Sequence, residues 1–169
     1  GEFELTGLGW GTYQISEALA PQGYTGSASF TVTVNASNAG ASQSFGPFEN
    51  VRKQGGVTWT KTDADTAALL AGSTWTLTGP GVPADTVVTD CTAGPCSTDP
   101  FTDQDPAVGA FRLSGLAWGS YTLTEKDAPA GYVGDPAPLN FSVTSATVSQ
   151  PIDLGAVERA DHGLDFLII

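Results

Sequence analysis

The chain has 169 residues, with 6 Lys and Arg against 18 Asp and Glu, and a formal net charge of -12. A balance this acidic repels phosphate groups and anionic lipids, so we expect neither a nucleic-acid partner nor membrane contact in this segment. Hydrophobic residues make up 40% of the chain, enough for a core, while 21 Gly and 11 Pro divide it into short pieces, which favours small β-rich domains.

Apolar and polar residues alternate along most of the chain, and this period of two predicts β-strands. Strands are expected at residues 3–5, 12–17, 29–34, 57–61, 74–78, 110–113, 120–125, 139–144 and 163–169. Turn residues separate the later strands at 63–66, 79–83, 115–119 and 128–132, and only residues 66–70 could form a helical turn. Short strands at this spacing predict an all-β fold, a sandwich of about a hundred residues per domain.

One segment occurs twice in the chain, 108 residues apart. GEFELTGLGWGTYQISEALAPQGY at residues 1–24 returns as GAFRLSGLAWGSYTLTEKDAPAGY at residues 109–132. The shared Gly, Pro and aromatic positions identify tandem copies of one domain. Residues 57–169 then hold a nearly complete copy and residues 1–54 the second half of a preceding one, with the joint expected at Gly55 and Gly56.

The two cysteines lie in the short segment CTAGPC. Cys91 and Cys96 pair readily in an oxidising compartment, so we favour a local disulfide and an extracellular setting over two free thiols. With His162 as the single histidine and no second cysteine pair, we expect no metal site and no cofactor. The nearby acidic residues Asp99 and Asp103 are more typical of a solvated loop than of a calcium site.

The repeated residues carry a family resemblance. VTWTKTDADTAALLAGSTWTL at 57–77, followed by the repeat at 109–132, resembles the Cna B-type domain of Gram-positive surface adhesins and sortase-assembled pilins. The resemblance lies in a strand lysine before an acidic turn, an LAG segment and a YxLxExxAPxGY box, and it spans most of 57–144. It implies tandem Greek-key β-sandwiches of the transthyretin or prealbumin type, the first one incomplete, at the cell surface or in the cell wall of a Gram-positive bacterium.

The resemblance also implies an internal isopeptide bond between a strand lysine and a closing-strand Asn or Asp. A lysine amine attacks only when neutral, and burial lowers its pKa; burial also raises the pKa of a neighbouring carboxyl group, which can then shuttle the proton. By this resemblance Lys61 is the nucleophile and Glu125 the shuttle in the complete copy. Glu17 is the shuttle and Asn50 the acceptor in the half copy, whose own lysine is not in the sequence. Such a bond forms in a single turnover, and we expect no enzyme acting on an external substrate.

The complete copy departs from this pattern because it has no clear acceptor. Aligning FGPFEN at 45–50 with LGAVER at 154–159 puts Arg159 where the half copy has its acceptor. Arginine cannot be an acceptor, but it could pair with the box glutamate in a buried ion pair. In the other register GLDFLII at 163–169 closes the sheet, and Asp161 and Asp165 are then the remaining acceptor candidates.

The leading hypothesis is a structural stalk segment of a surface adhesin or pilin, whose partners are neighbouring domains or subunits of the same fibre. One alternative is a ligand-binding adhesin module that grips a host protein or glycan with the loop at 79–106. A second is a filament subunit in which a strand from another chain completes the half copy. A third is an accessory β-domain of a carbohydrate-processing enzyme.

Overall fold

The computed structural model describes residues 1–159, in which every regular element is a β-strand, so the all-β prediction is confirmed. The chain divides into two units, the first Gly1–Arg52 and the second beginning at Lys53. The first unit contains one antiparallel pair, β1 (Gly11–Ile15) with β2 (Phe30–Val34). The second contains β3 (Gln54–Asp63), β4 (Thr74–Thr78), β5 (Val87–Thr89), β6 (Ala110–Ala117), β7 (Gly119–Asp127), β8 (Leu139–Val143) and β9 (Ile152–Arg159).

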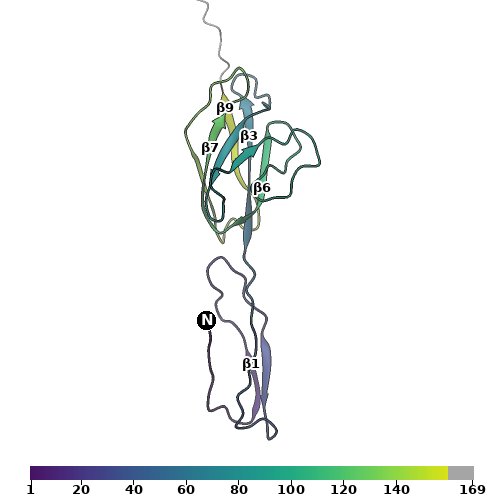
Figure 1. Cartoon of the computed structure of the whole chain (residues 1–169), viewed down its shortest axis with the longest axis vertical. Coiled ribbons are helices and arrows are strands. Elements are labelled where there is room, and N and C mark those ends of the chain that lie inside the picture. Colours follow the sequence, from purple (N-terminus) through teal and green to yellow (C-terminus); the bar gives the residue numbers. More distant parts are fainter. Residues whose placement is uncertain (160–169) are drawn as a thin grey trace, which may run out of the picture. The chain divides into compact units, whose positions relative to one another are not determined.

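Two sheets form the second unit (Figure 1). One has the strand order β6-β3-β9 and the other the order β5-β4-β7-β8. All neighbouring strands are antiparallel except β3 and β9, the first and last described strands of the unit, which pair in parallel. These two strands, nearly a hundred residues apart in the sequence, are therefore hydrogen-bonded neighbours.

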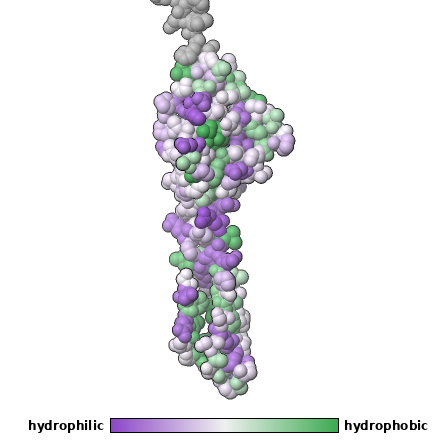
Figure 2. Space-filling view, in the orientation of Figure 1, coloured by the Kyte–Doolittle hydropathy of each residue, from purple (hydrophilic) through white to green (hydrophobic). Residues whose placement is uncertain are grey.

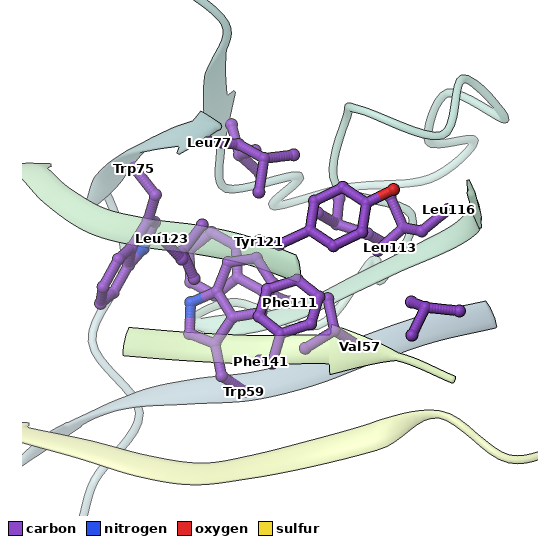
Figure 3. Packing of buried hydrophobic residues seen from close by; sticks show 12 residues of the cluster. Val57, Trp59, Trp75, Leu77, Phe111, Leu113, Leu116, Tyr121, Leu123 and Phe141 are labelled. Atoms are coloured by element: carbon purple, nitrogen blue, oxygen red, sulfur yellow. The ribbon is translucent and has the colours of Figure 1, made fainter. Parts of the chain in front are cut away.

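The core lies between the two sheets and is rich in aromatic rings. Trp59 of β3 stacks on Phe111 of β6 at 4.7 Å between ring centroids, and Trp75 of β4 meets Trp59 edge-on at 5.8 Å (Figure 3). Offset stacks and edge-on contacts of this kind are the favoured aromatic geometries. The core residues mostly occupy alternate positions on their strands, as the period of two predicted, and the exception is the step from Leu113 to Leu116, where the pairing of β6 with β3 shifts register. The buried core consists of Val57, Trp59, Trp75, Leu77, Val88, Phe111, Leu113, Leu116, Tyr121, Leu123, Phe141 and Val143.

A one-residue bulge changes the alternation along β9. Thr58 pairs with Asp153 and Thr60 with Ala156, so β9 advances three residues while β3 advances two. Gly155 sits in the bulge with a φ of 77°, a left-handed conformation that glycine adopts without steric cost. Before the bulge the even-numbered residues of β9 turn toward the core, and after it the odd-numbered ones, ending with Arg159.

The predicted repeat has the same local structure in both units. Pairing of β1 with β2 reproduces the pairing of β7 with β8, including the match of Gly11↔Val34 with Gly119↔Val143. The tyrosine of each copy donates to a backbone carbonyl four residues earlier, from Tyr13 to Gly9 at 2.9 Å and in the second copy over 2.8 Å.

Several predicted elements differ from the structure. Residues 66–70 form no helical turn, and the loop at 79–106 contains the short strand β5. Gly55 and Gly56 are not a joint but buried positions inside β3, where a Cβ on Gly56 would lie 2.7 Å from a backbone carbonyl oxygen of β6. The units instead divide after Arg52. The strand expected at 163–169 lies outside the described residues.

The strand expected at residues 3–5 is also absent. In the second unit the equivalent residue, Phe111, belongs to β6, which pairs with β3. Phe111 is 1% exposed, whereas Phe3 is 66% exposed. The described part of the first unit has no counterpart of β3 to pair with this segment. Figure 2 shows apolar side chains of the first unit at its surface, among hydrophilic ones.

The turn after β3 is organised by one aspartate. The carboxylate of Asp63 accepts from the backbone N–H groups of Asp65 and Thr66, from the Thr66 hydroxyl, and from the Tyr132 hydroxyl at 2.7 Å. The hydrogen bond from Tyr132, followed by those from Thr66, lowers the pKa of Asp63 to about 2.

The lowered pKa makes the stability of this turn dependent on pH. Because the folded-state pKa lies below the unfolded value of 3.8, the stabilisation is present above that value and lost as pH falls toward about 2. We expect Asp63→Asn to lower the free energy of unfolding at neutral pH, and this deficit to disappear near the lower value, as measured by urea unfolding across the range. Asp65→Asn, an exposed control in the same turn, should change it by less than about 0.5 kcal/mol. A deficit of Asp63→Asn that stays constant with pH would contradict the assignment.

The bulge in β9 gives a second prediction. Gly155→Ala forces a Cβ into a left-handed conformation and should destabilise the second unit by about 1–2 kcal/mol. Gly134→Ala is the matched control, because its added Cβ would meet only ordinary contacts, the nearest at 3.8 Å. Equal urea midpoints for the two variants would show that the bulge tolerates a side chain.

Candidate functional site

A buried ion pair continues the core at one end of the second unit. On β3 the alternation that turns Val57 and Trp59 inward also turns Lys61 inward, and on β7 it does the same for Glu125 after Leu123. Because the two strands belong to opposite sheets, the two charged side chains meet across the core. Lys61 Nζ lies 2.7 Å from Glu125 Oε1, and both side chains are 0% exposed.

Arg159, at the end of β9, closes the same site. Its Nε lies 3.4 Å from Glu125 Oε2, and its Nη2 lies 3.2 Å from Asp135 Oδ2. The backbone N–H of Asp135 donates to Glu125 Oε2 at 3.0 Å. The network thus joins β3, β7, β9 and the segment before β8, with two positive and two negative side chains.

Burial determines the electrostatics of the site. Loss of solvent lowers the pKa of Lys61, while the hydrogen bond and charge of Glu125 oppose that shift. Lys61 Nζ, Glu125 Oε1 and Arg159 Nε have no hydrogen-bond partner outside the ion pairs. The ion pairs are therefore what compensates for removing these charges from water, and deleting Glu125, which pairs with both cations, would leave Lys61 buried and unpaired.

The first unit holds a smaller version of the same arrangement. Asn50 Nδ2 donates to Glu17 Oε1 at 2.9 Å, and the backbone N–H of Ser27 donates to Glu17 Oε2 at the same distance. These bonds, that from Asn50 first, lower the pKa of Glu17. The structure therefore brings Glu17 and Asn50 together, as it brings Lys61 and Glu125 together in the second unit.

Asn50 and Arg159 occupy equivalent places in the two units. Each lies four positions after a glycine with positive φ, Gly46 (103°) or Gly155 (77°). Each also contacts the glutamate of the repeated box in its own unit, through a hydrogen bond in the first unit and an ion pair in the second. Arg159 therefore takes the place that Asn50 has in the first unit. Among the described residues, Glu125 is the one carboxylate within ion-pair distance of Lys61.

The other predicted residues lie apart from this network. Cys91 and Cys96 form a disulfide. Asp161, Asp165 and His162 lie outside the described residues. Within residues 1–159 no group of three or more His, Cys, Asp or Glu side chains could hold a metal ion, and no helix has the length and hydropathy of a membrane span.

Asp103 differs from the solvated residue expected from the sequence. It is 2% exposed and accepts from the backbone N–H groups of Cys91, Asp105 and Arg112 at 2.8 to 3.0 Å. Burial raises the pKa of Asp103, against the effect of these hydrogen bonds. Asp103 thus fixes the disulfide loop against β6, a role that spacing alone does not distinguish from a solvated acid.

Comparisons with known proteins agree with this fold. The family model for the SpaA prealbumin-like fold domain matches residues 55–154. No curated protein matches the chain.

Solved structures also match. The TIE protein of Bacillus anthracis has a TM-score of 0.64 and 20% identity, covering 91% of this chain and 26% of its own. BcpA, the major pilin subunit of Bacillus cereus, has a TM-score of 0.43 and 25% identity, and the match covers 63% of this chain and 29% of BcpA. The shaft pilin SpaA of Lactobacillus rhamnosus GG has a TM-score of 0.42 and 20% identity, and the match covers 90% of this chain and 65% of the pilin.

The chain spans about a quarter of the TIE protein structure, and that likeness shows a common fold. The family match covers more than half of the chain and coincides with the two-sheet unit that carries Lys61 and Glu125. The chain belongs to the family of SpaA prealbumin-like fold domains.

Proposed function

We propose that this chain is a structural stalk segment of a fibre on the surface of a Gram-positive bacterium, with neighbouring domains or subunits of the same fibre as its partners. The observation that carries the proposal is the direct pairing of β3 with β9 in the second unit. Its first and last described strands, β3 and β9, are paired in one sheet and are joined to the opposite sheet through Glu125. A domain that is entered and left on paired strands transmits tension through that pair, which suits a tandem array of such domains.

We propose that the box glutamate takes part in a covalent crosslink in the first unit and in an ion pair in the second. In the first, Glu17 and Asn50 have the contact required of a proton shuttle and an acceptor amide. A lysine from outside the described residues would attack Asn50 Cγ; an Nζ–Cγ bond forms, the Cγ–Nδ2 bond breaks, and ammonia leaves with the relayed proton. In the second unit Arg159 supplies no group that an amine can displace, so Lys61 stays a charged partner of Glu125.

One alternative is favoured by the exposed face of the first unit. Residues buried in the second unit have exposed counterparts in the first, among them Leu5 at 56% against 0% for Leu113. A strand from another chain, alternating apolar residues with a lysine, would cover this face and bring a cation to Glu17. In that case the segment is a strand-complemented filament subunit.

The adhesin alternative rests on the disulfide loop. A surface hollow there is lined by eight residues, four of them polar: Gly94, Pro95, Cys96, Ser97, Thr98, Gln104, Pro106 and Ser114. Binding of a host protein or glycan by the purified chain, lost when these residues are substituted while β5 is kept, would favour this alternative over a stalk.

The stalk proposal predicts where the protein is found. Gold-labelled antibodies against the chain should mark surface filaments of the source cells at repeated intervals in electron micrographs. Antibodies against a cytoplasmic protein of the same cells provide the control. Label confined to the cell interior, or to the culture medium, would contradict a fibre role.

The difference between the units predicts the intact mass. Under denaturing conditions the chain should be lighter than its sequence by about 2 Da for the disulfide, without the further loss of about 17 Da that accompanies amide transfer to lysine. Arg159→Asn places a carboxamide against Glu125 and should lose that ammonia, with Lys61 linked to position 159 in the peptide map. The same variant carrying Lys61→Arg is the control and should lose nothing. A crosslink from Lys61 to Asp161 or Asp165 in the natural chain would contradict the ion-pair assignment.

A further inference from the structure

We propose that the second unit is a reversible extension module: a mechanical clamp, held by the parallel β3–β9 pair and the Lys61–Glu125–Arg159 network, that opens at high load and closes again. The inference rests on the proposed stalk function and adds to it what this unit does under tension. It follows from the direction of the paired strands, the position of the ion pairs, and the places of the covalent links.

The strand directions determine how tension acts. The chain enters β3 after Lys53 and leaves β9 after Arg159, and Val57 pairs with Ile152 while Asp63 pairs with the arginine. Both strands therefore begin at the same end of the sheet. Tension pulls the start of one strand and the end of the other in opposite directions along the strand axis. The hydrogen bonds of the ladder are then loaded together, in shear, rather than broken one after another.

The ion pairs lie where sliding would begin to separate the strands. Lys61 on β3 and Arg159 on β9 contact opposite oxygens of one Glu125 carboxylate on the other sheet. If β9 slides along β3, Arg159 leaves the carboxylate while Lys61 and Glu125 are still buried. Stripping a partner from buried charges is costly, so the network adds resistance at the start of the movement.

The covalent links do not prevent extension once the clamp opens. The disulfide joins Cys91 to Cys96 and encloses a loop with a sequence separation of 5. In the described residues it is the one covalent link between side chains, and it does not connect β3 to β9. Residues 54–159 can therefore extend to roughly 350 Å of chain at about 3.3–3.6 Å per residue. Ion pairs and ladder bonds re-form on relaxation, whereas a covalent tie would prevent the extension.

Single-molecule force spectroscopy on the whole chain tests this inference. Held by its two ends, the chain should show an event with a length gain on the order of 300 Å that returns after relaxation. With handles at positions 53 and 150, both at the starting ends of the paired strands, the ladder opens bond by bond. The opening force should then fall roughly twofold or more at the same pulling rate.

Two variants separate the network from general stability. Glu125→Gln should lower the opening force in the end-to-end geometry, and Asp135→Asn, which removes only the outer partner of Arg159, should lower it by less. Glu158→Gln is the control, because this residue is exposed on the same strand. The length gain itself reports whether each variant is folded.

Three results would overturn the inference. These are the absence of a length gain from the second unit, equal forces in the two geometries, and an opening force that does not respond to Glu125→Gln in a variant that shows the full gain. Failure of the stalk proposal is a separate result, because it concerns antibody labelling of cells and leaves these force measurements unchanged.

Discussion

The pairing of β3 with β9 is the constraint on which the rest of the second unit depends. It places the first and last described strands of the unit side by side in one sheet, and the strands between them, except β6, lie in the second sheet. The two sheets provide the facing surfaces on which the aromatic core is built. It also brings Lys61 and Arg159 to one end of the core, within reach of Glu125.

A charged network in this place is unusual for a core because ionised groups are rarely buried without partners. The alternation that buries Trp59 leaves no freedom for Lys61 two residues later, so its charge must be matched from the opposite sheet. The carboxylate of Glu125 balances the charge of Lys61, and the ion pair between Arg159 and Asp135 completes the network. Apolar packing thus determines where the charges lie, and the charges restrict which side chain can occupy the end of β9.

The sequence was informative wherever a pattern repeated. The two copies of the box predicted strands at 12–17 and 120–125, and one of the two registers that the sequence allowed, the alignment of 45–50 with 154–159, put Arg159 at the position of Asn50. The period of two identified Lys61 and Trp59 as neighbours on one face. These features are local, and local alternation can be seen in the residues themselves.

Features that depend on distant contacts were not predictable in the same way. Residues 3–5 have the strand pattern of their copy, but a strand needs a partner, and pattern does not show whether one is present. Gly55 and Gly56 resemble a flexible joint because glycine often marks one, yet they are required by the close approach of neighbouring strands. Asp103 resembles a solvated acid because its backbone donors are remote from it in sequence.

The bulge at Gly155 has a consequence for the chemistry of β9. A bulge acts on side-chain alternation as an inserted letter acts on a reading frame, since every residue after it changes face. Were β9 regular over the same residues, Glu158 would turn toward Glu125 and Arg159 toward solvent, placing two carboxylates together in the core. The sign of the charge that seals this end of the sandwich is therefore set by the backbone of a single glycine, four residues before the charge itself.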